Sequence, residues 1–181
     1  MKTLILFGHN DLNKSMVSNN WLKHLKSKNL GDTTILAISE LVKDGNFDTA
    51  AQREIIRQHD KILIIFPLYW YSHPSLLQKY LEQVLTGSDN AEFVNELRQA
   101  ESKQLMIAVT AAAEQKNFAM GAAANFPLDV YLSNWMGLAK YCNMKFLPTF
   151  ASFNVYAQSQ AQLTEECEKM YTQFLTAKAR N

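Results

Sequence analysis

Glycine, cysteine and net charge are all scarce in this chain of 181 residues. Its six glycines are a smaller share of the chain than the roughly 7% found in an average protein. They form no GxGxxG or Walker pattern. Its two cysteines, Cys142 and Cys167, lack metal-ligand spacing, so we interpret them as reduced thiols and expect no metal site. The 18 Lys and Arg against 17 Asp and Glu leave a net charge of +1, which argues against a nucleic-acid partner.

Long hydrophobic runs are absent as well. The longest, from Ile62 to Tyr71, has ten residues and contains a proline, whereas a helix needs about 20 apolar residues to cross a bilayer. The N-terminal stretch MKTLILFGHND has an apolar segment that stops within five residues, so it does not resemble a signal peptide. We therefore expect no membrane insertion and a cytoplasmic location.

The hydrophobic residues that are present fall into short runs. With 48% hydrophobic and 19% charged residues, the chain has the composition of a single folded domain over residues 1–181. Strands are predicted for the runs at residues 4–7, 33–38, 62–66, 105–109 and 145–150. Because nearly continuous apolar strands alternate with helix-length segments, we predict an α/β, three-layer fold with a five-stranded parallel sheet covered on both faces.

Amphipathic periodicity predicts the helices. The clearest apolar stripe follows the third strand and consists of Leu76, Leu77, Tyr80, Leu81, Val84 and Leu85. A similar stripe, formed by Val17, Trp21, Leu22 and Leu25, follows the first strand. Thr49 with Gln52 fits a capping box, residues 86–103 form the longest polar connection, and the tail from about 159 to 179 is predicted to be a last surface helix.

Three segments are predicted to meet at the carboxyl ends of the strands, where open parallel sheets bind ligands. The first, Gly8 to Ser15, carries donors at the start of a helix, where free amides favour a phosphate, although a plain helix cap is the simpler interpretation of this segment alone. The second, Phe66 to Ser75, has four aromatic residues and two prolines, so it offers amides and ring faces to a flat ring system or packs in a core or interface. The third, Thr110 to Phe118, leaves the fourth strand.

Together these segments resemble the flavodoxin-like NAD(P)H:quinone oxidoreductases, the family that includes the DT-diaphorase type, the bacterial drug-activity modulators and the ancillary oxidoreductases of potassium-efflux systems. The resemblance rests on LFGHNDLNKS, on FPLYWYSHPSLLQKYLEQVL, and on the weaker AVTAAAEQKNFAMG and YCNMKFLPTF. It implies a strand order of 2-1-3-4-5, a bound flavin, and a homodimer whose active site forms between subunits.

The resemblance also implies roles for particular residues. His9 with the turn Ser15, Met16, Val17 and Ser18 would hold the flavin phosphate. Leu68, Tyr69, Trp70 and Tyr71 would lie along the isoalloxazine ring, and Thr110, Ala111, Ala112 and Ala113 would close over its other edge. The flavin would pass a hydride from NAD(P)H to a quinone or similar flat acceptor, and our hypothesis is that Tyr71 or His73 donates a hydrogen bond to the developing quinol oxygen.

Several positions depart from the family pattern. Alanines stand at Ala111 to Ala113 where the family usually has Thr-Gly-Gly after a threonine, Ser18 replaces an asparagine, and the polar segment 86–103 replaces an aromatic, glycine-rich loop. These departures leave a second interpretation open, a regulatory or binding protein with weak or lost flavin chemistry, such as an ancillary subunit with a membrane-transporter partner. FMN-dependent azo-compound reduction is a third. FMN is favoured over FAD because the chain lacks the C-terminal extension of the FAD-binding relatives.

Overall fold

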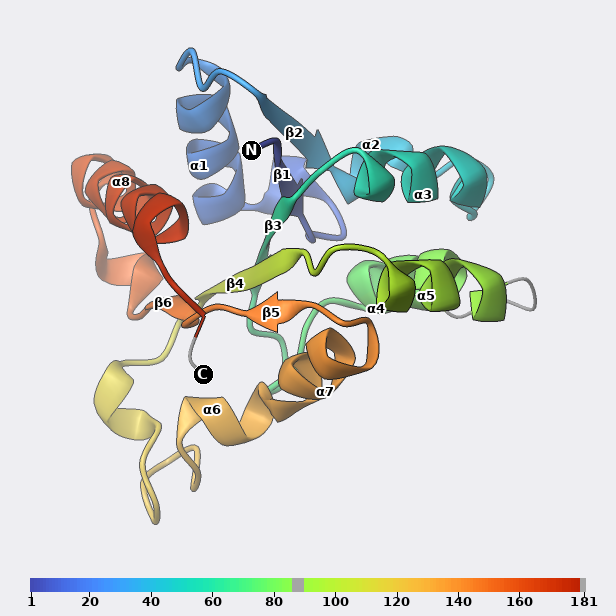
Figure 1. Cartoon of the computed structure of the whole chain (residues 1–181). Coiled ribbons are helices and arrows are strands. Elements are labelled where there is room, and N and C mark those ends of the chain that lie inside the picture. Colours follow the sequence, from blue (N-terminus) through green and yellow to red (C-terminus); the bar gives the residue numbers. More distant parts are fainter. Residues whose placement is uncertain (86–89, 180–181) are drawn as a thin grey trace.

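A parallel sheet forms the centre of the molecule (Figure 1). The computed structural model describes residues 1–85 and 90–179. Strands β1 (Thr3–Phe7), β2 (Thr33–Ala37), β3 (Lys61–Pro67) and β4 (Gln104–Thr110) pair in the order β2-β1-β3-β4, all parallel, with β5 at the far edge. The predicted fold class and the strand order 2-1-3-4-5 are confirmed.

The fifth strand differs from the prediction because it is divided. The run predicted as one strand at 145–150 forms β5 (Lys145–Phe146) and β6 (Phe150–Ser152), and both pair with β4. Pro148 lies between the two pieces, and a proline has no amide hydrogen to donate to a neighbouring strand. Within the described residues the sheet therefore has six strands, with β5 and β6 following one another along the same edge of β4.

Helices cover both faces of the sheet. Among the described residues they are, in chain order, η1 (Leu12–Lys14), α1 (Met16–Lys26), α2 (Ile38–Leu41), α3 (Thr49–Arg57), α4 (Ser75–Leu85), α5 (Asn90–Gln99), η2 (Gln115–Asn117), α6 (Leu128–Tyr131), α7 (Ser133–Tyr141), η3 (Val155–Ala157) and α8 (Gln160–Thr176). Helices α1 and α8 pack on one face, while α3, α4, α5 and α7 pack on the other (Figure 1). Successive β3 side chains alternate between these two layers, as the pleat of a strand requires.

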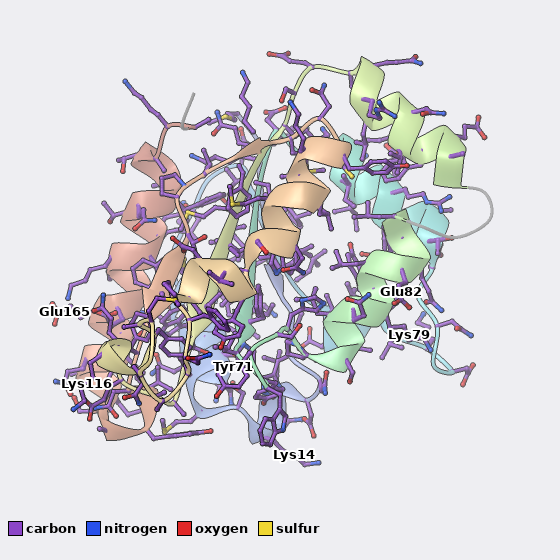
Figure 2. The ribbon with its side chains drawn as sticks, turned by 90° about the horizontal axis from the view of Figure 1, so that it is seen from below. Lys14, Tyr71, Lys79, Glu82, Lys116 and Glu165 are labelled. Carbon is purple, nitrogen blue, oxygen red and sulfur yellow. The ribbon has the colours of Figure 1, made fainter. Side chains whose placement is uncertain are left out.

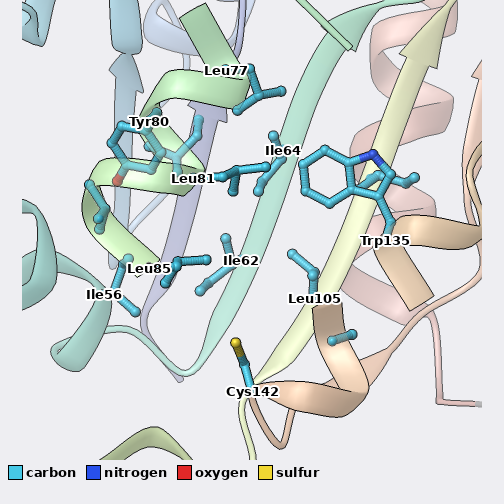
Figure 3. Close-up of a cluster of buried hydrophobic side chains, with 14 of the residues drawn as sticks. Ile56, Ile62, Ile64, Leu77, Tyr80, Leu81, Leu85, Leu105, Trp135 and Cys142 are labelled. Atoms are coloured by element: carbon cyan, nitrogen blue, oxygen red, sulfur yellow. The ribbon is translucent and has the colours of Figure 1, made fainter. Parts of the chain in front are cut away.

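The larger of the two cores lies under α4. The predicted stripe of this helix is buried at Leu77, Tyr80, Leu81, Val84 and Leu85. Figure 3 shows Leu81 and Leu85 of this helix meeting β3 residues from one side, while Trp135 of α7 contributes its indole from the other. Burial of each large apolar side chain contributes about 1.5–3 kcal/mol, so α4 is held firmly against the strand that leads into the second predicted segment.

The second core joins α1 to α8. The predicted α1 stripe is buried, and the indole Nε1 of Trp21 donates a hydrogen bond to the Leu163 carbonyl of α8 at 2.8 Å. Helix α8 starts with a capping box in which Ser159 and Gln162 satisfy each other's backbone amides. The helix predicted for the tail is therefore present, and one of its faces is buried against the sheet.

Two local predictions are wrong. The N-cap of α3 is Asp48 and not Thr49. The Asp48 carboxylate accepts a hydrogen bond from the Ala51 amide at 3.0 Å. Gln52, the proposed partner in that capping box, is buried and accepts a hydrogen bond from the Tyr80 hydroxyl at 3.4 Å. The polar segment 86–103 contains α5, because Phe93, Val94 and Leu97 form a buried stripe at helical spacing; its first four residues, 86–89, lie outside the described residues.

In residues 1–85 and 90–179, no helix is both long and apolar enough to span a membrane. The same residues contain no group of three or more His, Cys, Asp or Glu side chains placed to hold a metal ion. Cys142 and Cys167 are buried and unbonded to each other, and burial raises the pKa of both thiols.

Candidate functional site

The loop after β1 is built to present the start of helix α1. Asp11 caps η1 by accepting from the Asn13 amide, and Ser15 caps α1 by accepting from the Ser18 amide at 3.0 Å. The amides of Met16 and Val17, the first two residues of α1, have no acceptor within the helix. This end of α1 therefore offers free donors and the positive end of the helix dipole.

A cavity of about 220 Å³ lies at this point, at the carboxyl ends of β1, β3 and β4. Its walls are formed by His9, Lys14, Ser15, Met16, Val17, Pro67, Leu68, Tyr69, Thr110, Ala112, Val155 and Tyr156. These lining residues include a lysine and no carboxylate. The cavity is thus suited to an anionic group, and it lies where a parallel sheet is expected to bind one.

His9 and Tyr69 face each other in this cavity. The ring of His9 is only 5% exposed, and its Nδ1 accepts a hydrogen bond from the Asp11 amide at 3.0 Å. Its Nε2 lies 2.8 Å from the Tyr69 hydroxyl oxygen. Burial lowers the pKa of His9, while the nearby negative charge of Asp11 raises it in part, and burial raises the pKa of Tyr69. Both groups are therefore neutral at pH 7.

The aromatic segment after β3 forms a tight turn. The amides and carbonyls of Tyr69 and Ser72 exchange hydrogen bonds of 2.8 and 3.0 Å, and Trp70 and Tyr71 occupy the two central positions with φ of +47° and +64°. Holding two aromatic residues in the left-handed region costs conformational free energy that glycine at these positions would not incur. Such strain is typical of functional loops.

The turn directs its two central side chains out of the cavity. Trp70 is 93% exposed, and Tyr71, which is 41% exposed, stacks on Tyr131 with a ring separation of 4.7 Å. Figure 2 shows Tyr71 on the same side of the molecule as Lys14. Phe126 contacts Tyr131 edge-on at 6.2 Å, so Tyr71, Tyr131 and Phe126 form an aromatic cluster that adjoins the exposed Trp70 in the turn.

The alanine segment after β4 adopts ordinary backbone geometry. None of Ala111, Ala112 and Ala113 has a positive φ, although six other non-glycine residues of the described chain do. The segment is held by hydrogen bonds from the Ala111 amide to Ser152 and from the Asn154 amide to Ala113, at 2.8 and 2.9 Å. Because no residue here needs the left-handed region, alanine in place of glycine carries no backbone strain.

The structure brings together most of the predicted site residues. Those that line the cavity are His9, Ser15, Met16, Val17, Leu68, Tyr69, Thr110 and Ala112. Ser18 is buried within α1, and Ala111 and Ala113 form backbone contacts beside the cavity without lining it. Sequence reasoning missed Val155 and Tyr156 as site residues, because the divided fifth strand concealed that η3 follows β6 at the same edge of the sheet.

His73, predicted as a donor to a quinol, lies elsewhere. Its ring packs edge-on against Phe66 and Trp135, and its Nε2 is bonded to the Gln78 side chain at 2.5 Å. It lines a separate cavity of about 230 Å³ among α4, α5 and α7, together with Cys142. The cavity at the ends of β1, β3 and β4 does not include it.

A larger but more open hollow of about 710 Å³ runs along α1 and α8. It shares Lys14, Ser15 and Met16 with the smaller cavity, and its remaining lining is polar. It contains none of the aromatic residues that follow β3, so it offers no surface for a flat ring. The smaller cavity is therefore the candidate site.

Comparisons with known proteins agree with this geometry. The family model described as flavodoxin-like fold matches residues 1–175. The glutathione-regulated potassium-efflux system ancillary protein KefF of Citrobacter koseri is 31% identical over 149 residues, covering 82% of this chain and 81% of that protein. Among solved structures, an NADPH-quinone reductase from P. pentosaceus is 28% identical with a TM-score of 0.77, covering 97% of this chain and 98% of the other.

A further structure is similar in fold. General stress protein 14 from Treponema denticola, solved in complex with FMN, has a TM-score of 0.82 at 22% identity, covering 96% of this chain and 98% of that one.

Proposed function

We propose, because this chain belongs to the family of flavodoxin-like folds, that it is a flavin-dependent oxidoreductase. It binds FMN and transfers two electrons from NAD(P)H to a quinone or a similar flat acceptor. The FMN-bound general stress protein 14 and the NADPH-quinone reductase among its structural relatives support this proposal.

The observation that carries the proposal is the composition of the 220 Å³ cavity. The free amides of Met16 and Val17 meet there, and the lining includes Lys14, whose ammonium pairs with Asp11 at 3.2 Å, but no carboxylate. This donor set fits a phosphate monoester. The volume is below the roughly 300–1,000 Å³ of pockets that enclose a whole ligand of this size, so the flavin ring would lie partly in the open mouth of the cavity.

The protein's own residues would bind and orient the cofactor. The start of α1 would hold the phosphate, and the rigid turn from Tyr69 to Ser72 with the strain-free Thr110–Ala113 segment would position the ring. When bound, FMN supplies the hydride chemistry, so the chain needs no acid–base pair of its own. Neither of the two groups suggested as donors to the quinol oxygen lines this cavity. Tyr71 is favoured because it lies in the turn that begins at the lining residue Tyr69, whereas His73 is held in another cavity by its bond to Gln78.

We also propose a cytoplasmic homodimer. Trp70 is almost fully exposed in a strained turn, next to the stacked pair of Tyr71 and Tyr131. Exposed aromatic residues clustered in this way are typical of interfaces. A second subunit packed on this cluster would cover the open mouth of the cavity.

The similarity to KefF supports a second candidate, a regulatory subunit of a potassium-efflux system. In that case the fold would serve association with a transporter, and flavin chemistry would be weak or lost. The two functions differ in whether the chain binds a flavin, so one titration separates them.

The experiment is to purify the protein, record its visible absorption spectrum, and titrate the flavin-free form with FMN and FAD while following flavin fluorescence. We expect a yellow protein or a submicromolar Kd for FMN, followed by NAD(P)H-dependent quinone reduction. Absence of binding by either flavin at about 100 μM, which corresponds to roughly −5.5 kcal/mol, would exclude the oxidoreductase and favour the regulatory subunit. Tyr71→Phe should lower turnover and leave FMN bound.

A further inference from the structure

We infer that the Tyr69 hydroxyl donates a hydrogen bond directly to the phosphate of the bound flavin, and that His9 is the positioning residue that aims this hydroxyl. The inference rests on the proposed function and deepens it. It moves the Tyr69 side chain from the flavin ring, where the family resemblance put it, to the phosphate end of the cavity.

The first step concerns the proton on His9. The Asp11 amide donates to Nδ1 at 3.0 Å, so Nδ1 must present a lone pair. The ring is buried and neutral, since burial lowers the pKa of His9. A neutral imidazole has one N–H group, and that group is therefore at Nε2.

The second step follows from the contact between Nε2 and Tyr69. The N–H of Nε2 points to the Tyr69 oxygen at 2.8 Å, so the tyrosine oxygen accepts this hydrogen bond. The tyrosine proton cannot lie on the same line and must point to another group. Within the described chain, the Tyr69 hydroxyl has no hydrogen-bond partner other than His9, and burial raises its pKa so that it keeps its proton.

The third step is the position of this free donor. His9 and Tyr69 both line the 220 Å³ cavity, together with Lys14 and the first residues of α1. A hydroxyl that donates to an anion forms a short, strong hydrogen bond. The hydroxyl is thus a side-chain donor added to the backbone amides of α1 at the same anion-binding position, and the buried ring of His9 keeps it in place.

Tyr69→Phe tests the donor, because it removes one oxygen and keeps the ring. FMN and riboflavin, which differ in the phosphate, are titrated into flavin-free protein. We expect the Kd for FMN to rise roughly 10- to 100-fold, the range for a hydrogen bond to a charged group, and the Kd for riboflavin to change less than about twofold. Tyr141→Phe, on the exposed side of α7, is the matched control and should change neither value.

Two variants of His9 test its positioning role. His9→Gln keeps a side-chain N–H that can reach Tyr69 and should retain most of the preference for FMN over riboflavin. His9→Leu removes the N–H and should reduce that preference about as much as Tyr69→Phe does. The double variant Tyr69→Phe/His9→Leu should lose no more than either single variant, because both act through one hydrogen bond.

The outcomes separate this inference from the proposed function. If the wild-type protein binds neither FMN nor riboflavin, the proposed function fails and the inference fails with it. If the wild-type protein binds FMN, but Tyr69→Phe leaves the FMN-to-riboflavin ratio unchanged or lowers both affinities equally, the inference alone is wrong. Additive losses in the double variant would show that His9 does not act through Tyr69.

Discussion

Asn10, in the loop after β1, caps the helix that follows β3. Its Oδ1 accepts a hydrogen bond from the Leu76 amide at 3.0 Å, and its Nδ2 donates to the Ser75 hydroxyl at 3.2 Å. Asn10 and Leu76 are 66 positions apart in the sequence, so this one side chain joins the two segments that form most of the cavity. The start of α4 takes its cap from a loop distant in the sequence, in addition to the preset geometry of Pro74.

Asn10→Ala removes this cap. We expect the free energy of unfolding to fall by about 1 kcal/mol, the usual cost of a lost N-cap, and the Kd for FMN to rise because the turn before α4 loses an anchor. Urea denaturation and the flavin titration measure the two effects. Asn95→Ala, on the exposed face of α5, is the asparagine control. Equal stability of Asn10→Ala and the wild-type protein would show that the cap contributes nothing.

Gly8 permits close approach of α4 to the end of β1. A Cβ atom at this position would lie 2.6 Å from Cδ2 of Leu77, whose side chain is fully buried. We expect Gly8→Ala to lower the free energy of unfolding by about 1–3 kcal/mol through overpacking. Leu77→Ala creates the space that the new methyl group needs, so the double variant should lose less than the sum of the two single changes. Simple additivity in urea denaturation would contradict this explanation.

Trp70 tests the proposed dimer. Its side chain is exposed and its φ of +47° is unfavourable for every residue with a Cβ. Trp70→Gly should therefore leave the circular dichroism spectrum unchanged and weaken dimerisation at least tenfold in sedimentation velocity, as expected for a tryptophan at an interface centre. Leu175→Ala, an exposed residue of α8 on the opposite face of the sheet, should not alter association. A wild-type monomer at micromolar concentration would reject the dimer.

His9 makes stability depend on pH. Because burial lowers its pKa in the folded protein from an ordinary value of about 6.5, the unfolded chain takes up a proton first as the pH falls below 6.5. The free energy of unfolding should then decrease, by at most about 1.4 kcal/mol per pH unit, until the pH reaches the lowered pKa. Urea denaturation of the flavin-free protein at pH 7.5 and 5.5 should show a smaller decrease for His9→Gln, which does not titrate. Identical decreases would mean that His9 is not the group responsible.

Much of the architecture is determined by local pattern. Four apolar runs became β1 to β4, and the stripes of α1 and α4 are buried, because periodicity reports which face of an element avoids water. Local pattern failed where the deciding contact was distant. Gln52 matched a capping box, yet it is buried against Tyr80. Pro148 was visible in the sequence, but only the pairing of both flanking pieces with β4 shows that the strand is divided.

The candidate site, too, was predictable in part from local sequence pattern and in part decided by the tertiary structure. Its residue types and its place at the carboxyl ends of the strands were predictable, because a parallel sheet brings those ends to one edge. The sequence by itself did not separate Tyr69 from its neighbours Trp70 and Tyr71. The tertiary structure did, because the tight turn from Tyr69 to Ser72 reverses the chain, sending Tyr69 inward to His9 and Trp70 outward to solvent. Side-chain direction in such a turn depends on backbone angles that only the packed loops hold in place.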